Sequence, residues 1–171
     1  MAGGEYPTYS CRTLNLEPGN LNFELFVTEG SEMAFNVLII DDSSTMRSLI
    51  RKIMGIAGFP VGQYFEGANG REALEILNHE CVDVILTDLN MPEMDGKALL
   101  QTIRGKTDWK DLPVILITTE RRPEILSQYS RLGFQGIINK PFRPETIKQV
   151  LSEIMGEPDV ATIAESEGCD F

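Results

Sequence analysis

Residues 84–96 read VILTDLNMPEMDG, and this segment carries the clearest structural signal in the chain. A short apolar run leads into Asp88, and the loop-forming residues Asn90, Pro92 and Gly96 come soon after it. A run of this kind is typical of a parallel strand that is covered on both faces. Residues that follow such strands lie at the carboxyl edge of the sheet, where α/β proteins bind ligands. We therefore expect Asp88 to belong to a binding or reaction site.

Three other apolar runs also end in polar residues. These are Asp41 and Asp42 after residues 37–40, Thr118 after residues 114–117, and Lys140 after residues 136–139. If all four strands belong to one parallel sheet, then three carboxylates, a hydroxyl and an ammonium group meet at one edge. This is the composition of a site that takes a phosphoryl group on an aspartate with the help of a divalent metal ion.

The middle of the chain alternates between strand and helix patterns five times. The predicted strands are 36–41, 61–65, 82–88, 113–118 and 136–139, and the predicted helices are 44–57, 70–78, 96–104, 123–132 and 144–155. Ser43 or Ser44 can cap the first helix and Asn69 the second, while Pro123 and Pro144 suit the first turns of the last two. Such alternation predicts an α/β fold, with a parallel sheet covered by helices on both faces.

Charge and cysteine content limit the class of protein. The net charge is -11, and five acids with one base in residues 1–34 and five acids with no base in residues 156–171 supply most of it. An acidic chain is a poor candidate for nonspecific nucleic-acid binding. Cys11, Cys81 and Cys169 are widely spaced and predict neither a zinc site nor a disulfide framework. There is no secretory signal pattern and no apolar run long enough to span a membrane, so we expect a cytoplasmic protein.

The two ends of the chain depart from the alternating pattern. Residues 1–34 form an extension in which 14–16 and 21–25 alternate with period two around Pro18-Gly19. This favours a β-hairpin, with a mobile arm as the alternative. Met33 stands just before the first predicted strand, so a shorter product that starts there would keep the whole domain, 35–155. The acidic residues 156–171 are typical of a disordered tail.

The polar strand ends have specific chemical roles in this interpretation. Asp88 is the candidate nucleophile that forms an acyl phosphate. Asp41, Asp42 and Asp88 offer the oxygen ligands that Mg²⁺ prefers, Lys140 offers a positive charge, and Thr118 offers a hydroxyl group. Each residue also has a purely structural interpretation, as a helix cap, a turn residue or a solvated side chain. Their joint occurrence at successive strand ends favours the functional one.

With these motifs, residues 35–155 closely resemble the response-regulator receiver domain, above all its single-domain, CheY-like kind. The resemblance rests on Asp41-Asp42, on 88–92 with Asp95-Gly96, on Thr118, and on Lys140-Pro141-Phe142. It implies a five-stranded parallel sheet of order 2-1-3-4-5 and phosphorylation of Asp88 by a histidine kinase. It also implies direct Mg²⁺ ligation by Asp42, Asp88 and the Asn90 backbone carbonyl, with Asp41 acting largely through water. A cis bond before Pro141 is expected.

The resemblance also assigns tuning and switching positions. Asn90 and Glu120 stand two residues after Asp88 and Thr118, where members of the family tune hydrolysis of the acyl phosphate. Thr118 and the residue three positions before the lysine form the switch, and that residue is Ile137 where many members carry Tyr or Phe. The resemblance therefore implies phosphorylation of Asp88 but not an aromatic switch.

The chain is thus expected to be a stand-alone response regulator of a phosphorelay, a phosphoacceptor rather than an enzyme. Its expected partners are a histidine kinase and a downstream protein, either a flagellar-motor switch in chemotaxis or a phosphorelay partner; its oligomeric state is left open. One alternative is a small-molecule phosphotransferase or phosphatase with an aspartyl intermediate, although Asn90 stands where such enzymes need a second acid. The other is a binding module that ignores phosphorylation.

Overall fold

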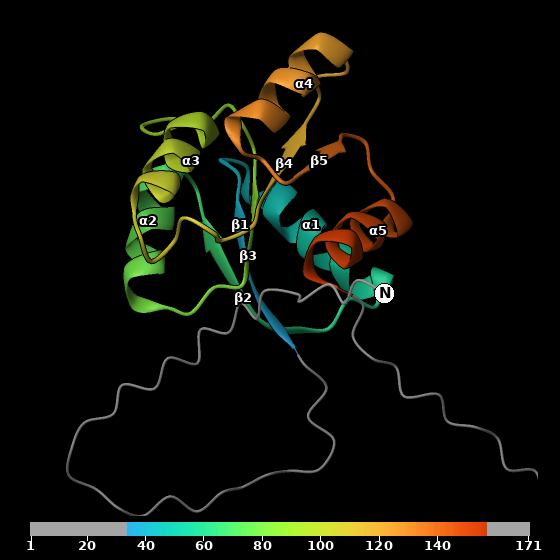
Figure 1. The fold of residues 1–171 in the computed structure, drawn as a ribbon. Coiled ribbons are helices and arrows are strands. Elements are labelled where there is room, and N and C mark those ends of the chain that lie inside the picture. The colour runs from blue at the N-terminus through green and yellow to red at the C-terminus, as the bar shows by residue number, and fades with distance from the viewer. Residues whose placement is uncertain (1–33, 157–171) are drawn as a thin grey trace, which may run out of the picture.

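A single parallel sheet with helices on both faces forms the domain in the computed structural model, which describes residues 34–156 (Figure 1). The strand order is β2-β1-β3-β4-β5, and all four pairings are parallel. The strands are β1 (Phe35–Ile40), β2 (Val61–Gly67), β3 (Val84–Thr87), β4 (Val114–Thr118) and β5 (Gly136–Asn139). The predicted α/β fold and its strand order are confirmed.

The five helices begin where the sequence predicted. They are α1 (Ser44–Ala57), α2 (Gly70–His79), α3 (Gly96–Gly105), α4 (Pro123–Leu132) and α5 (Pro144–Met155). Side chains of Ser43, Asn69 and Asp95 accept hydrogen bonds from backbone N–H groups in the first turns of α1, α2 and α3. Both α4 and α5 begin with proline instead. Each helix therefore starts with local chemistry that suits a helix N-terminus.

The apolar core consists of two layers, one on each face of the sheet. Successive residues of a strand point to opposite faces, so Val37 and Ile39 belong to one layer and Leu38 and Ile40 to the other. Helices α1 and α5 cover the first face, and α2 and α3 cover the second (Figure 1). Burial on both faces explains why β1, β3 and β4 are continuous apolar runs.

The register brings the carboxyl ends of the strands to one level. Ile40 of β1 pairs with Thr87 of β3, and the backbone N–H of Asp88 still donates to the Ile40 carbonyl at 2.8 Å. The strand predicted over 82–88 is shorter than expected. At its beginning the Asp83 carboxylate accepts from the backbone N–H of Asn36 at 2.7 Å, which brings a side chain into the backbone pairing there. Asp88 consequently stands directly beyond the end of β3.

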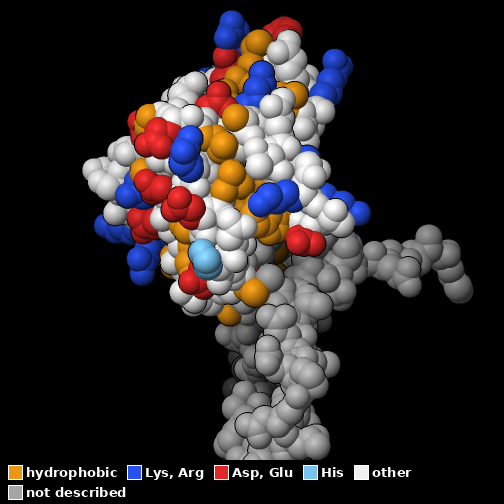
Figure 2. Space-filling model, turned by 90° about the vertical axis from the view of Figure 1, so that its left-hand side faces the viewer, with side chains coloured by type: hydrophobic (Ala, Val, Ile, Leu, Met, Phe, Trp, Pro, Cys, Tyr) orange, Lys and Arg blue, Asp and Glu red, His pale blue; other side chains and the backbone are white. Residues whose placement is uncertain are grey.

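The described surface mixes charges of both signs with apolar side chains on the face that α2 and α3 cover (Figure 2). Within residues 34–156, no helix is both long and apolar enough to cross a membrane. The hairpin predicted within residues 1–34 and the disordered tail predicted over 156–171 fall on segments outside the described residues, so both stay predictions.

Candidate functional site

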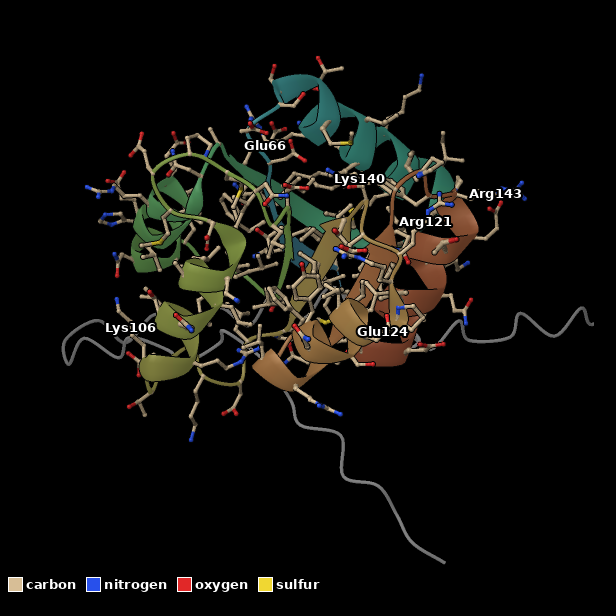
Figure 3. All side chains as sticks on the ribbon, turned by 90° about the horizontal axis from the view of Figure 1, so that it is seen from above. Glu66, Lys106, Arg121, Glu124, Lys140 and Arg143 are labelled. Carbon is tan, nitrogen blue, oxygen red and sulfur yellow. The ribbon has the colours of Figure 1, made fainter. Side chains whose placement is uncertain are left out.

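The side chain of Lys140 joins two of the predicted acidic residues. Its Nζ atom lies 2.8 Å from Oδ1 of Asp88 and 3.0 Å from Oδ2 of Asp41. Asp41 follows β1, Asp88 follows β3 and Lys140 follows β5, so three separate strand ends supply the three groups. Viewed from above, Lys140 lies over the middle of the domain, with Arg121 and Arg143 on the side of α5 (Figure 3).

The second oxygen of each carboxylate is held by the backbone. Oδ1 of Asp41 accepts from the N–H of Ser43 at 2.9 Å, and Oδ2 of Asp88 accepts from the N–H of Asn90 at 2.8 Å. The guanidinium of Arg47 also donates to the backbone carbonyl of Asp41 at 2.7 Å. Each acid thus has one oxygen on the ammonium group and one on a neighbouring amide, which fixes both carboxylates in place.

Burial and charge act in opposite directions on Lys140. Burial alone would lower the pKa of its ammonium group, since it penalises the charged form. The hydrogen bonds and negative charges of Asp88 and Asp41 outweigh that penalty, so the pKa of Lys140 lies above its ordinary value. The Asp88 side chain is 15% exposed and that of Asp41 is 4% exposed. Asp88 is therefore the carboxylate of this pair that a reagent from solution can reach more easily.

The loop after Asp88 needs a glycine at position 96. A Cβ atom built there would lie 2.3 Å from the carbonyl oxygen of Asp88, a contact that no side chain can make without moving the backbone. The N–H of Gly96 in turn donates to the Leu89 carbonyl at 3.0 Å, and Glu93 adopts a positive φ of 61° in between. The loop folds back on the end of β3 and starts α3 there, which explains the spacing between Asp88 and Asp95-Gly96.

Thr118 stands at the end of β4, beside the loop that carries Lys140. Its backbone carbonyl accepts from the N–H of Lys140 at 2.7 Å, and its hydroxyl accepts from the N–H of Glu120 at 3.1 Å. Among the described residues, its hydroxyl makes no hydrogen bond to Asp88 or to the Lys140 ammonium group. The structure therefore places Thr118 at the predicted edge without joining it directly to the acids. The bond between Lys140 and Pro141 is cis, as expected.

The other tuning and switch positions, besides Thr118, have different surroundings. The carboxylate of Glu120 is bound by Arg122, and the hydrogen bond between the two side chains is the main reason that the pKa of Glu120 falls to about 2. Asn90 is exposed and contacts Asp88 through its backbone N–H. Ile137 is half-buried and packs on the core layer of α2 and α3.

The predicted metal ligands fit Mg²⁺ in their chemistry. Asp41, Asp42, Asp88 and the backbone carbonyl of Asn90 are all hard oxygen donors, and Mg²⁺ is commonly held by one or two carboxylates together with water molecules. Within residues 34–156, no three acidic, imidazole or thiol side chains converge as a closed metal site would need. Asp42 is exposed, and the Lys140 ammonium group bridges the other two acids. The donor chemistry therefore suits Mg²⁺, while the three carboxylates do not converge on one point in the described part of the chain.

Sequence reasoning missed two basic residues that position the candidate site. Arg47 on α1 donates to the carbonyl of Asp41 and pairs with Glu66 of β2 at 3.1 Å. Arg122 binds the carboxylate of Glu120. The position of Arg122, two residues after Glu120, was a usable signal in the sequence. The sequence offered no such signal for Arg47, because its partners Asp41 and Glu66 belong to the end of β1 and to β2.

Comparison with known proteins identifies the family and the fold of the domain. The response regulator receiver domain family matches residues 37–152. A chemotaxis protein CheY homolog of Campylobacter jejuni is 36% identical over 121 residues, which cover 70% of this chain and 92% of that protein. Chemotaxis protein CheY-3 of Vibrio cholerae is 39% identical over 118 residues, covering 69% and 89%. The solved structure of the Vibrio cholerae chemotaxis response regulator CheY4 has a TM-score of 0.64 and 33% identity, covering 71% of this chain and 99% of that one.

The match includes β1 from Val37 onward, the other four strands in full, and every strand end that carries a candidate site residue. Both the family match and the identity to these relatives extend over more than half of the chain. The chain therefore belongs to the response regulator receiver domain family, as a CheY-like phosphoacceptor of two-component signalling.

Proposed function

We propose that Asp88 is the residue that accepts the phosphoryl group, that a histidine kinase supplies it, and that the transfer depends on Mg²⁺. The observation that carries this proposal is the ion pair between Lys140 and both Asp41 and Asp88 at three converging strand ends. Of the two paired acids, Asp88 has the more exposed side chain, and it follows the central strand β3. Self-phosphorylation and self-dephosphorylation are the expected reactions, with no small-molecule turnover.

In the transfer, an oxygen of Asp88 forms a bond to phosphorus while the bond between phosphorus and the donor atom breaks. The transition state carries negative charge on the phosphoryl oxygens, so nearby positive groups favour it. Lys140 is placed to neutralise that charge because its Nζ atom already lies 2.8 Å from Asp88. A Mg²⁺ ion held by Asp41, Asp42, Asp88 and the Asn90 carbonyl would supply the remaining neutralisation. Thr118 can donate its hydroxyl hydrogen to a phosphoryl oxygen.

Phosphorylation then changes binding of a downstream protein at the surface of α4, β5 and α5. The added charge draws in Thr118 and Lys140 and biases the loop between β4 and α4. Since the curated relatives reported above are named chemotaxis proteins, a flagellar-motor switch is the partner that this likeness favours, with a phosphorelay protein as the alternative. Ile137 has no ring, so position 137 cannot act as an aromatic switch.

The test is incubation of the full chain with acetyl phosphate and Mg²⁺, followed by mass spectrometry. We expect one added phosphoryl group on Asp88, and none in Asp88→Asn or when Mg²⁺ is removed with a chelator. A wild-type protein that never gains the group would refute the proposal. An adduct that persists in Asp88→Asn would move the acceptor elsewhere. Sustained release of phosphate from small esters would favour the enzyme alternative, and partner binding that ignores the adduct would favour the phosphorylation-independent module.

A further inference from the structure

Helices α4 and α5 begin with the same tripeptide, Arg-Pro-Glu, at residues 122–124 and 143–145. In both, the arginine is the N-cap residue, its side chain makes no capping hydrogen bond, and proline stands in the first turn. The residue two positions before the arginine differs between the two helices: it is Glu120 before α4 and Pro141 before α5. Glu120 therefore offers a carboxylate at the start of α4 where Pro141 can offer none.

That carboxylate is bound to the start of α4 on both of its oxygens. Oε1 of Glu120 accepts from the backbone N–H groups of Arg121 and Arg122, each at 3.0 Å, and from Nε of Arg122 at 2.9 Å. Oε2 pairs with Nη2 of Arg122 at 2.5 Å. We call this bidentate ion pair the Glu120–Arg122 clamp. It also satisfies backbone donors at a helix start that has no side-chain cap of its own.

The backbone of Glu120 reaches in the other direction, toward the phosphorylation site. Its N–H donates to the Thr118 hydroxyl at 3.1 Å, and its carbonyl accepts from the side-chain amide of Asn139 on β5. Because the Thr118 oxygen acts as an acceptor in this bond, its own hydrogen remains available, and no described residue accepts it. A phosphoryl group on Asp88 supplies oxygens that can accept that hydrogen.

Helix α4 can move if the backbone of Glu120 is displaced toward the phosphorylation site. None of its residues is buried, whereas α5 buries Ile147 and Leu151. An element that is held by a few polar contacts moves at lower cost than one that is packed into the core. The apolar contacts of α4 are half-buried ones, such as that of Tyr129 with Phe134, so the polar contacts at its start hold a larger share of this helix than they do in α5.

We propose that Arg122 is a positioning residue that transmits the phosphorylation of Asp88 to the start of α4, through its clamp on Glu120 and the bond between Glu120 and Thr118. Movement of the Thr118 hydroxyl toward a phosphoryl oxygen pulls the backbone of Glu120, and the clamp carries this pull to the first turn of α4. The side-chain hydrogen bond from Arg122 lowers the pKa of Glu120 to about 2, so the carboxylate of the clamp stays ionised well into the acidic range. This inference rests on the proposed function of Asp88.

The test is hydrogen exchange of the full chain, measured by mass spectrometry with and without beryllium fluoride and Mg²⁺ as a mimic of the phosphoryl group. In the wild type, we expect protection to change both in the loop after Asp88 and over residues 119–126. In Arg122→Ala, we expect the change in the loop after Asp88 to persist and the change over 119–126 to be lost. Arg122→Lys keeps the charge but cannot form the bidentate pair, so it should show part of the change over 119–126 that Arg122→Ala loses.

The matched control is Arg143→Ala, which removes the equivalent arginine at the start of α5. It should respond to beryllium fluoride as the wild type does, in both regions. The inference is overturned if Arg122→Ala keeps the full change over 119–126, or if Arg143→Ala loses it as well. A different result, in which even the wild type shows no change after Asp88, would refute the proposed function itself. Equal thermal unfolding of the two variants without the mimic confirms that both are folded.

Discussion

Helices α4 and α5 share their first three residues but are held in place by different interactions. Helix α5 buries Ile147 and Leu151 in the core layer that it shares with α1. Helix α4 buries none of its residues, and its start is held by the Glu120–Arg122 clamp, while the Glu120 N–H bonds to Thr118 at the end of β4. The local sequence therefore sets where both helices begin, and the surroundings decide how firmly each of them is held.

The difference follows from the size of the two kinds of interaction. A fully buried leucine or isoleucine side chain contributes about 1.5–3 kcal/mol through removal of apolar surface from water. An exposed ion pair contributes far less and is weakened further by salt. Tyr129 of α4 is half-buried, and its ring meets that of Phe134 edge-on with the centroids 6.3 Å apart. Helix α5 is thus part of the scaffold, and α4 is suited to change.

The largest expected effect is a difference in stability when the same substitution, leucine to alanine, is made in each of the two helices. Leu151→Ala in α5 should lower the free energy of unfolding by about 2–5 kcal/mol, because it empties a fully buried site. Leu126→Ala in α4 should lower it by about 1 kcal/mol or less, because that side chain is half-buried. Urea unfolding followed by circular dichroism measures both. Equal losses for the two variants would mean that α4 is anchored as firmly as α5.

A second prediction concerns the loop that leads into α5. Lys140→Met removes the ammonium group that neutralises Asp41 and Asp88, so Mg²⁺ should bind more tightly, by about tenfold. Lys148→Met on the exposed face of α5 removes the same charge away from the site and serves as the control. Calorimetric titration with Mg²⁺ compares the two variants. Unchanged or weaker binding in Lys140→Met would show that Lys140 and the metal ion do not share these carboxylates.

Much of this arrangement could be predicted because it depends on local patterns. Apolar runs that end in Asp41, Asp88, Thr118 and Lys140 define strands and their polar ends, and parallel strands must bring those ends to one edge. The close approach of the Gly96 backbone to Asp88 is local too, although the Asp95-Gly96 pair predicted only a loop and the start of a helix.

Contacts between segments far apart in the chain could not be predicted from these local sequence patterns. Arg47 reaches Asp41 and Glu66 because α1 lies over β1 and β2, and no spacing in the sequence encodes that geometry. The two Arg-Pro-Glu segments are alike in sequence, and the burial that distinguishes α5 from α4 appears only when the layers are assembled.

A third prediction compares the two arginines in the resting protein. Arg122→Ala should leave the global free energy of unfolding nearly unchanged while hydrogen exchange at the first turn of α4 becomes faster, because the Glu120 carboxylate loses its partner. Arg143→Ala should leave exchange at the first turn of α5 unchanged, since burial of Ile147 and Leu151 holds that helix. Residue-resolved NMR exchange gives both values. Faster exchange at both helix starts would remove the distinction between them.

The smallest effect is the titration of Glu120 itself. Its pKa is lowered from 4.5 to about 2, mainly by the side-chain hydrogen bond to Arg122, so folding favours the ionised form. The contribution of the clamp is then fully present above the ordinary pKa of glutamate and is lost as the pH falls through about 2. The side-chain carbonyl signal of Glu120, followed by NMR, should titrate near the lower value in the wild type and in Arg143→Ala. In Arg122→Ala it should return toward 4.5. A wild-type midpoint at the ordinary value would mean that the carboxylate is not clamped in solution, and the start of α4 would then be as free of polar anchoring as the start of α5.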